Sequence, residues 1–248
     1  MSGTILITGS GRGIGAATAL LAARKGYAVC VNYANRSERA DQVVAAIRQG
    51  GGKAIAVQAD VSDEGAVNAL FETAIAELGP LVALVNNAGV TGKIGRLADI
   101  EMQTLRRTIE INLLGTMLCA REAVRRMSTA AGGKGGAIVN ISSRAVHQGA
   151  PGEYVHYAAT KAAVETFTVG LAREVSGEGI RVNCVSPGLI ETEIHAAGGD
   201  AGRIQRLIPL IPMQRVGKAE EVAKAILWLL SDEAAYCSGT ILTVSGGR

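Results

Sequence analysis

The chain has 248 residues and is 48% hydrophobic, enough to bury the core of one large α/β domain or two small ones. Its 25 basic and 22 acidic residues leave a net charge of only +3, spread along the chain, so charge gives no support to a nucleic-acid-binding or membrane-surface role. No charge-free stretch reaches the ~18 apolar residues of a membrane helix, and the four cysteines lack both C-x-x-C spacing and a nearby histidine cluster, which argues against a membrane span or a metal site.

Short, nearly continuous apolar runs recur along the chain and predict buried β-strands. The first begins by Thr4, which leaves no room for a signal peptide, so we expect a cytoplasmic protein. Runs that are continuous rather than alternating are typical of strands covered on both faces in a parallel sheet. The predicted strands are Thr4–Thr8, Ala28–Asn32, Lys53–Gln58, Leu81–Asn86, Ala137–Ser142, Arg181–Ser186 and Thr240–Val244.

Longer segments with helical periodicity separate these strands, and glycines mark several of their ends. The predicted helices are Gly13–Lys25, Ser37–Gln49, Asp63–Leu78, Met102–Met127, Tyr154–Ser176 and Ala219–Leu230. The strand–helix alternation continues from one end to the other without a Pro- or Ser-rich linker. Residues 1–248 are therefore predicted to form one α/β domain, a doubly wound, seven-stranded parallel sheet with helices on both faces.

A glycine-rich turn, Thr8-Gly9-Ser10-Gly11-Arg12-Gly13-Ile14-Gly15, joins the first strand to the first helix. Glycines let the backbone turn sharply and approach a pyrophosphate, while the helix N-terminus supplies unpaired N–H groups and the positive end of its dipole. Such a turn in a strand–turn–helix setting predicts a dinucleotide site in a Rossmann-type fold.

The spacing of this turn, T-G-x-x-x-G-x-G, resembles the fingerprint of the short-chain dehydrogenase/reductase family. The resemblance continues along essentially the whole chain, at Asp60-Val61, the N-N-A-G segment that begins at Asn86, Asn112, the set Ser143, Tyr157 and Lys161, and the P-G-x-x-x-T segment from Pro187 to Thr192. It implies a NAD(P)-dependent oxidoreductase with Asn112, Ser143, Tyr157 and Lys161 as catalytic residues. It also implies that Asp60 and Val61 hold the adenine and that residues 187–192 lie along the nicotinamide.

The end of the second strand bears on the choice of cofactor. NAD enzymes of dinucleotide-binding folds place an acid about 20 residues after the glycine turn to hold the ribose 2′-hydroxyl, but no acid occurs from Asn32 to Arg36. Arg12 and Arg36 are placed to pair with a 2′-phosphate, so NADP is favoured over NAD. The expected cofactor residues are Gly9, Arg12, Gly13, Ile14, Gly15, Asn32, Tyr33, Arg36, Asp60, Val61, Asn87, Ala88, Gly89, Tyr157, Lys161, Pro187, Gly188, Ile190 and Thr192.

Tyr157 and Lys161 stand four residues apart in a predicted helix and so share one face. A nearby ammonium favours the phenolate and makes tyrosine a better acid and base near neutral pH. Tyr157 is expected to give a proton to the nascent alkoxide in reduction and to take one in oxidation. Ser143 is expected to hydrogen-bond the substrate oxygen, and Asn112 to hold a water that links Lys161 to solvent.

Two departures from the family pattern stand out. Ser143 precedes Tyr157 by 14 residues, one more than usual, which makes Ser142 a rival for the catalytic serine. We favour Ser143, which stands three residues after Asn140 in the family's N-x-x-S pattern, with the extra residue in the 144–153 loop. The second departure is Ser245, where many family members carry Asp.

The predicted activity is NADP-dependent hydride transfer with a small-molecule carbonyl or secondary alcohol substrate. A NAD-dependent sugar dehydrogenase and a 3-oxoacyl-thioester reductase remain alternatives, as does a nicotinamide sensor or scaffold without activity. The Gly-rich segment Ile190–Pro212 is expected to be a lid that sets substrate choice. Surplus apolar residues on Met102–Met127 and Tyr154–Ser176, including Leu113, Leu114, Met117 and Leu118, predict a homotetramer.

Overall fold

In a computed structural model, which describes residues 3–192 and 203–248, a seven-stranded parallel sheet forms the centre of the molecule. The strand order is β3-β2-β1-β4-β5-β6-β7, as expected for the doubly wound fold. The strands are β1 (Thr4–Ile7), β2 (Ala28–Tyr33), β3 (Ala54–Gln58), β4 (Leu81–Asn86), β5 (Gly136–Ile141), β6 (Ile180–Pro187) and β7 (Ile241–Val244).

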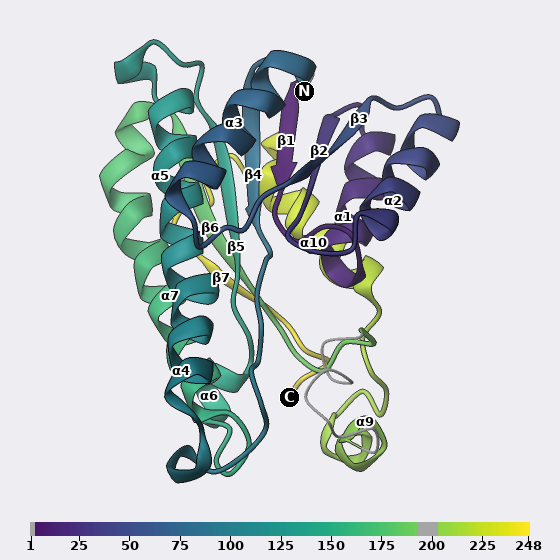
Figure 1. The fold of residues 1–248 in the computed structure, drawn as a ribbon, viewed down its shortest axis with the longest axis vertical. Coiled ribbons are helices and arrows are strands. Elements are labelled where there is room, and N and C mark those ends of the chain that lie inside the picture. Colours follow the sequence, from purple (N-terminus) through teal and green to yellow (C-terminus); the bar gives the residue numbers. More distant parts are fainter. Residues whose placement is uncertain (1–2, 193–202) are drawn as a thin grey trace.

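Helices cover both faces of the sheet (Figure 1). One layer holds α1 (Gly13–Arg24), α2 (Ser37–Gln49) and α10 (Ala219–Leu230), and the opposite layer holds α3 (Glu64–Leu78), α5 (Gly115–Met127) and α7 (Val155–Val175). The shorter helices are α4 (Met102–Ile109), α6 (Ala145–Gln148) and α9 (Arg203–Leu207). The predicted fold class is confirmed. Among the described residues, no helix is both long and apolar enough to span a membrane.

Packing on both faces of the sheet explains why the strands are continuously apolar in sequence. In β1, the fully buried Ile5 and Ile7 belong to the core beneath α1 and α10, whereas the equally buried Leu6 belongs to the core beneath α3 and α5. Successive side chains of a strand point to opposite faces, so a strand with helices on both sides needs apolar residues at every position. This double burial is why the strand bounds were predictable to within one or two residues.

The strand order reverses beside β1, and this reversal positions the functional site. β1 pairs with β2 on one side and with β4 on the other, so the chain leaving β1 turns into α1 while the chain leaving β4 turns to the opposite layer. The carboxyl ends of strands part at such a switch point and leave a crevice there. The glycine turn after β1 and the segment Asn87–Gly89 after β4 lie at this crevice.

The predicted continuous helix Met102–Met127 is wrong in one respect. A π-helical turn, Glu110–Leu114, separates α4 from α5 and places Asn112 at its centre with a fully buried side chain. Such turns insert an extra residue and occur frequently at functional sites, but a 3.6-residue hydrophobic pattern does not reveal them. Of the predicted lid Ile190–Pro212, residues 193–202 lie outside the described residues; α9 and the turn Ile208–Leu210 form the part that follows them.

Gly15→Ala tests the close packing of the glycine turn. A Cβ at Gly15 would lie 2.6 Å from Asn87 Nδ2 and 2.8 Å from the Gly9 carbonyl oxygen, whereas a Cβ at the helical Gly170 would meet no atom within 4 Å. We expect Gly15→Ala to lower the free energy of unfolding by about 1–3 kcal/mol through overpacking. Gly170→Ala should raise it by up to about 1 kcal/mol. Denaturant unfolding of both variants measures this, and equal stabilities would contradict the close contact of Gly15 with Asn87.

Candidate active site

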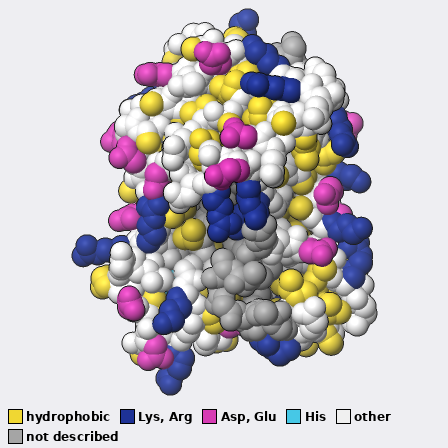
Figure 2. All heavy atoms as spheres, turned by 45° about the vertical axis from the view of Figure 1, so that its right-hand side comes forward, with side chains coloured by type: hydrophobic (Ala, Val, Ile, Leu, Met, Phe, Trp, Pro, Cys, Tyr) yellow, Lys and Arg dark blue, Asp and Glu magenta, His cyan; other side chains and the backbone are white. Residues whose placement is uncertain are grey.

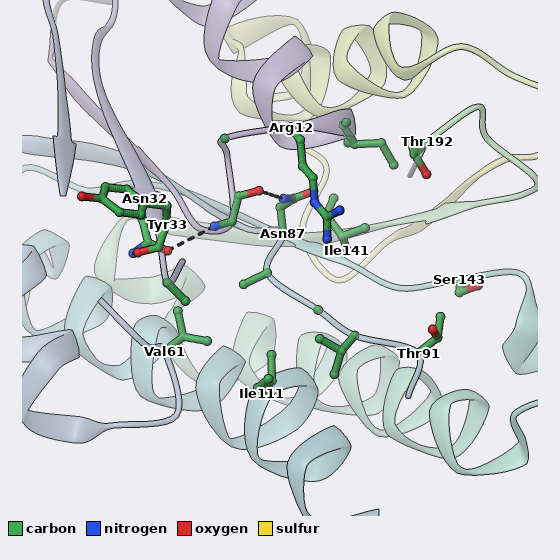
Figure 3. A pocket seen from close by; sticks show the side chains of 18 of the residues that line it. Arg12, Asn32, Tyr33, Val61, Asn87, Thr91, Ile111, Ile141, Ser143 and Thr192 are labelled. Carbon is green, nitrogen blue, oxygen red and sulfur yellow. Dashed lines mark hydrogen bonds between the residues drawn. The ribbon is translucent and has the colours of Figure 1, made fainter. Parts of the chain in front are cut away.

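A pocket of about 450 Å³ opens at the carboxyl ends of the strands and is lined from β1 through β6. In Figure 3, Asn32, Tyr33 and Val61 lie toward one end, Ser143 and Thr91 toward the other, and Arg12 and Asn87 between them. Every predicted cofactor residue except Gly15 lines this pocket, as do Ser143, Tyr157 and Lys161. The pocket therefore joins the predicted cofactor site and the predicted chemical site in one elongated cavity.

Two asparagine side chains hold the glycine turn in place. Gly9 and Gly13 adopt left-handed backbone conformations, with φ of 61° and 56°, which glycine tolerates without strain. The Gly9 N–H donates to Asn32 Oδ1 at 3.1 Å, and Asn87 Nδ2 donates to the Thr8 and Gly9 carbonyls at 2.9 and 3.0 Å. Asn32 Nδ2 also donates to the Ala59 carbonyl at 3.0 Å. The Asn32 side chain is thus engaged in shaping the pocket wall, and Gly15 acts through packing behind it.

The end of the pocket beyond β2 is basic. Tyr33, Ala34, Asn35 and Arg36 line it without an intervening acid, and Arg12 joins them from the glycine turn. Arg39, which the sequence analysis did not single out, lines the same end. Its signal in the sequence was its place in the first turn of α2, three residues after Arg36, which precedes the helix. Figure 2 shows Lys and Arg side chains gathered near the centre of the face that it presents.

Asp60, which was predicted to hold the adenine, has hydrogen-bond partners that the sequence analysis did not predict. Its carboxylate accepts hydrogen bonds from the Ser62 N–H at 3.0 Å and the Ser62 hydroxyl at 2.7 Å, and it pairs with Arg107 of α4. Burial tends to raise the pKa of Asp60, but the Ser62 and Arg107 hydrogen bonds outweigh it and lower that pKa. Asp60 therefore stays ionised, and Arg107 becomes a further lining residue.

Tyr157 and Lys161 form a buried pair on α7, with 8% and 4% of their surfaces exposed. The Lys161 ammonium lies 5.8 Å from the centre of the Tyr157 ring and donates to the Ile141 carbonyl at 2.7 Å. The Tyr154 ring contacts Tyr157 edge-on at 5.4 Å. Burial lowers the pKa of Lys161 to about 8, so the ammonium is still the main form at neutral pH.

The two candidate serines differ in orientation. Ser142 is 2% exposed, and its hydroxyl donates to Glu165 Oε1 at 2.7 Å and lies 3.2 Å from the Lys161 carbonyl oxygen. Ser143 is half-buried, and within the described part of the chain its hydroxyl oxygen accepts a hydrogen bond from the Ala145 N–H, at 3.2 Å. This arrangement favours Ser143 as the serine that faces a substrate, although both line the pocket.

Asn112 does not line the pocket. Its side chain accepts from the Val90 N–H at 2.8 Å and donates to the Val90 carbonyl at 2.8 Å and to the Thr160 hydroxyl at 3.1 Å. It thereby fixes the segment after Asn87–Gly89 against α7. Its expected role in holding a water beside Lys161 stays a prediction.

Comparison with known proteins places this pocket in a family. A family model described as enoyl-(acyl carrier protein) reductase matches residues 9–248. The uncharacterized oxidoreductase YgfF of Escherichia coli is 52% identical over 98% of both chains, and glucose 1-dehydrogenase 2 of Bacillus subtilis is 38% identical over 98% of this chain and 93% of its own. A short-chain dehydrogenase from Burkholderia cenocepacia, solved with NADP, superposes with a TM-score of 0.90 at 34% identity, covering 98% of this chain and 96% of that one. The chain belongs to the short-chain dehydrogenase/reductase family.

As a short-chain dehydrogenase/reductase, the chain is an oxidoreductase that acts on CH–OH or carbonyl groups with NAD or NADP. The pocket residues fit such a dinucleotide. The left-handed Gly9 lies in the turn before α1 and the left-handed Gly13 begins the helix, and such a helix N-terminus suits a pyrophosphate. A Cβ at Gly89 would lie 3.4 Å from the Lys161 ammonium, so the glycine keeps space open beside that group.

Lys161→Met tests the burial of the ammonium through stability. Between pH 8 and 10.5 the unfolded chain still holds the Lys161 proton that the folded chain has lost, because the folded pKa is about 8 and the unfolded value is 10.5. Folding stability from this group therefore rises with pH across that window and is lowest below it. The free energy of unfolding of wild type minus variant should rise by roughly 3 kcal/mol from pH 8 to 10.5. A flat difference between those pH values would show that Lys161 is not desolvated.

Proposed function

We propose that the chain is an NADP(H)-dependent oxidoreductase that interconverts a carbonyl and a secondary alcohol, with Tyr157 as general acid and base. The supporting observation is that Ser143, Tyr157 and Lys161 line the same pocket as the glycine turn with Arg12 and, beyond β2, Arg36 and Arg39. A nicotinamide sensor or scaffold is disfavoured, because it would not need a buried tyrosine–lysine pair. The cytoplasm remains the proposed location.

The chemistry assigned to this chain's residues is proton transfer and charge stabilisation. The bound nicotinamide supplies or accepts the hydride. In reduction, the Tyr157 hydroxyl gives its proton to the substrate oxygen, while the Ser143 hydroxyl donates a hydrogen bond as negative charge develops there. The Lys161 ammonium stabilises the phenolate that Tyr157 becomes. In oxidation, the Tyr157 phenolate removes the alcohol proton and the same contacts run in reverse.

The substrate itself stays open between two classes that the relatives suggest. Glucose 1-dehydrogenase 2 and the 3-oxoacyl-[acyl-carrier-protein] reductase of Synechocystis are 38% and 40% identical to this chain. NADPH consumption over a panel of 3-oxoacyl thioesters, sugars and simple ketones, repeated with NADH, is the experiment that separates them.

A homotetramer is proposed on the apolar surface of α4 and α5. Met102, Ile109, Leu114 and Met117 are exposed there, at 63%, 51%, 44% and 36%. Leu118, which the sequence analysis counted with this surplus, is instead buried in the core at 8%. Light scattering should give about four times the 25.5 kDa mass of one chain, and a single-chain mass at micromolar concentration would contradict the proposal.

Tyr157→Phe tests the chemical step. It removes the proton donor and keeps the ring that packs against Tyr154, so turnover should fall by about 100-fold or more while NADPH binding is nearly unchanged. Steady-state kinetics with fluorescence titration of NADPH measures both. Ser143→Ala should cost about 100-fold or more as well, and Ser142→Ala distinctly less. Near wild-type turnover in Tyr157→Phe would refute the mechanism. A larger loss of turnover in Ser142→Ala than in Ser143→Ala would identify Ser142 as the catalytic serine.

Tyr33→Asp and Arg36→Ala test the cofactor choice. Aspartate at position 33 adds repulsion toward a 2′-phosphate and an acceptor for a ribose hydroxyl, so the preference should invert toward NADH. Arg36→Ala should weaken NADPH by about ten- to hundredfold, the value of a charge-assisted hydrogen bond, and leave NADH nearly unchanged. Dissociation constants of both cofactors for wild type and variants give the answer. Tighter NADH than NADPH binding by wild type would refute the NADP proposal, whose support includes the NADP complex of the Burkholderia cenocepacia relative.

A further inference from the structure

The buried Ser142 and the half-buried Glu165 form a hydrogen-bonded pair beside the proposed catalytic residues. The Ser142 hydroxyl donates to Glu165 Oε1 at 2.7 Å and lies 3.2 Å from the Lys161 carbonyl oxygen. The neighbouring Ile141 carbonyl accepts the Lys161 ammonium at 2.7 Å. Two consecutive residues at the end of β5 are therefore bonded to two residues one helical turn apart on α7.

These bonds connect the two elements that carry the catalytic set. Ser143 follows Ser142 immediately, whereas Tyr157 and Lys161 stand one turn apart on α7 and Glu165 one turn further on the same helix face. The Ser142 N–H donates to the Val185 carbonyl of β6 at 2.8 Å, which anchors its backbone in the sheet. The Ser142 hydroxyl thus links a backbone fixed to the sheet with the catalytic face of α7.

The carboxylate of Glu165 faces the sheet. Burial raises the pKa of the Cys184 thiol on β6 to about 12, and the next largest contribution in the same direction is the charge of Glu165, while Lys161 acts in the opposite direction. The charges of Glu165 and Lys161 therefore both act on the Cys184 thiol. The Ser142 hydroxyl donates the hydrogen bond that ties this half-buried carboxylate to the end of β5.

We propose that Glu165 is a positioning residue, which accepts the Ser142 hydrogen bond and thereby holds the end of β5, with Ser143, in register with Tyr157 and Lys161. This inference rests on the proposed function of those three residues. Glu165 itself touches no reacting atom. It acts on the distance between Ser143, which follows β5, and Tyr157 on α7. A misplacement of a catalytic side chain by about 1 Å can lower the rate about 100-fold.

Three variants separate positioning from other roles. Glu165→Leu removes the acceptor, Glu165→Gln keeps an oxygen acceptor at the same length without the charge, and Ser142→Ala removes the donor. We expect Glu165→Leu to lower kcat by about 10- to 100-fold, with the NADPH dissociation constant within about threefold of wild type because the adenine and phosphate contacts are untouched. Glu165→Gln should retain at least about a third of kcat.

A double-variant cycle and two controls complete the test. The kcat of the double variant Ser142→Ala/Glu165→Leu should equal that of the slower single variant to within about threefold, because both substitutions remove the same hydrogen bond. Glu174→Leu, the same substitution at an exposed position of α7, should leave kcat unchanged. Each kcat is expressed per NADPH-binding site, so that a loss of folded protein alone does not lower it. If Glu165→Leu does not fold, Glu165→Gln and Ser142→Ala still carry the comparison.

Parallel measurement of Tyr157→Phe distinguishes the two possible failures. Full activity in Tyr157→Phe would overturn the proposed function. An impaired Tyr157→Phe alongside wild-type kcat in Glu165→Leu or in Ser142→Ala would overturn only the positioning role. If the fold-losses in kcat of the two single variants multiply in the double variant, the two side chains do not act through one bond, and the positioning role is overturned. It is also overturned if Glu165→Gln is as slow as Glu165→Leu, because the effect would then depend on the charge of Glu165 and not on its hydrogen bond.

Discussion

The buried ammonium of Lys161 is the constraint on which the site depends. Removing a charge from water is costly unless other groups take over its solvation. Here the Ile141 carbonyl accepts one hydrogen bond from the ammonium, and the face of the Tyr157 ring lies 5.8 Å away. Gly89 keeps the neighbouring space open. The Lys161 ammonium therefore requires three segments to lie beside it: the end of β5, the segment after β4 and one face of α7.

Several buried and half-buried polar side chains join the segments around the pocket. Asn112 bonds to both backbone groups of Val90, Asn87 bonds to two carbonyls of the glycine turn, and Ser142 bonds to Glu165. Buried polar groups that are fully bonded make one arrangement much more stable than its neighbours. These bonds tie the segments that line the pocket to one another.

The two ends of the pocket use charge differently. At the β2 end, Arg12, Arg36 and Arg39 line the wall with no acid among the pocket residues beside them, which suits a phosphate. At the end of β3, Asp60 is paired with Arg107 and bonded to Ser62, so its charge is balanced within the protein. Basic and neutralised walls in one cavity are consistent with a ligand whose negative charge is concentrated in its phosphates.

The sequence alone determined the sheet, its parallel pairing and the positions of the site residues along the chain. Strands buried on both faces are continuously apolar, so Leu81–Asn86 was predicted at its observed bounds and Ala28–Tyr33 within one residue. Parallel strands bring their carboxyl ends to one edge, so residues after different strands, such as Gly9 and Asn87, were predicted to meet. The glycine turn and the Tyr157–Lys161 spacing were readable because local backbone geometry sets both.

Tertiary structure decided what depends on contacts between distant segments. The π-helical turn at Asn112 leaves the hydrophobic pattern nearly unchanged, because one extra residue only rotates the helix beyond it. The roles of Arg107 and Glu165 arise from partners 47 and 23 residues away, Asp60 and Ser142. Which of Ser142 and Ser143 turns its side chain toward α7 was likewise decided by the packing of the strand end, and the catalytic role of Ser143 stays a prediction. Periodicity records which residues are buried, but pairings between polar groups are set only when the helices pack on the sheet.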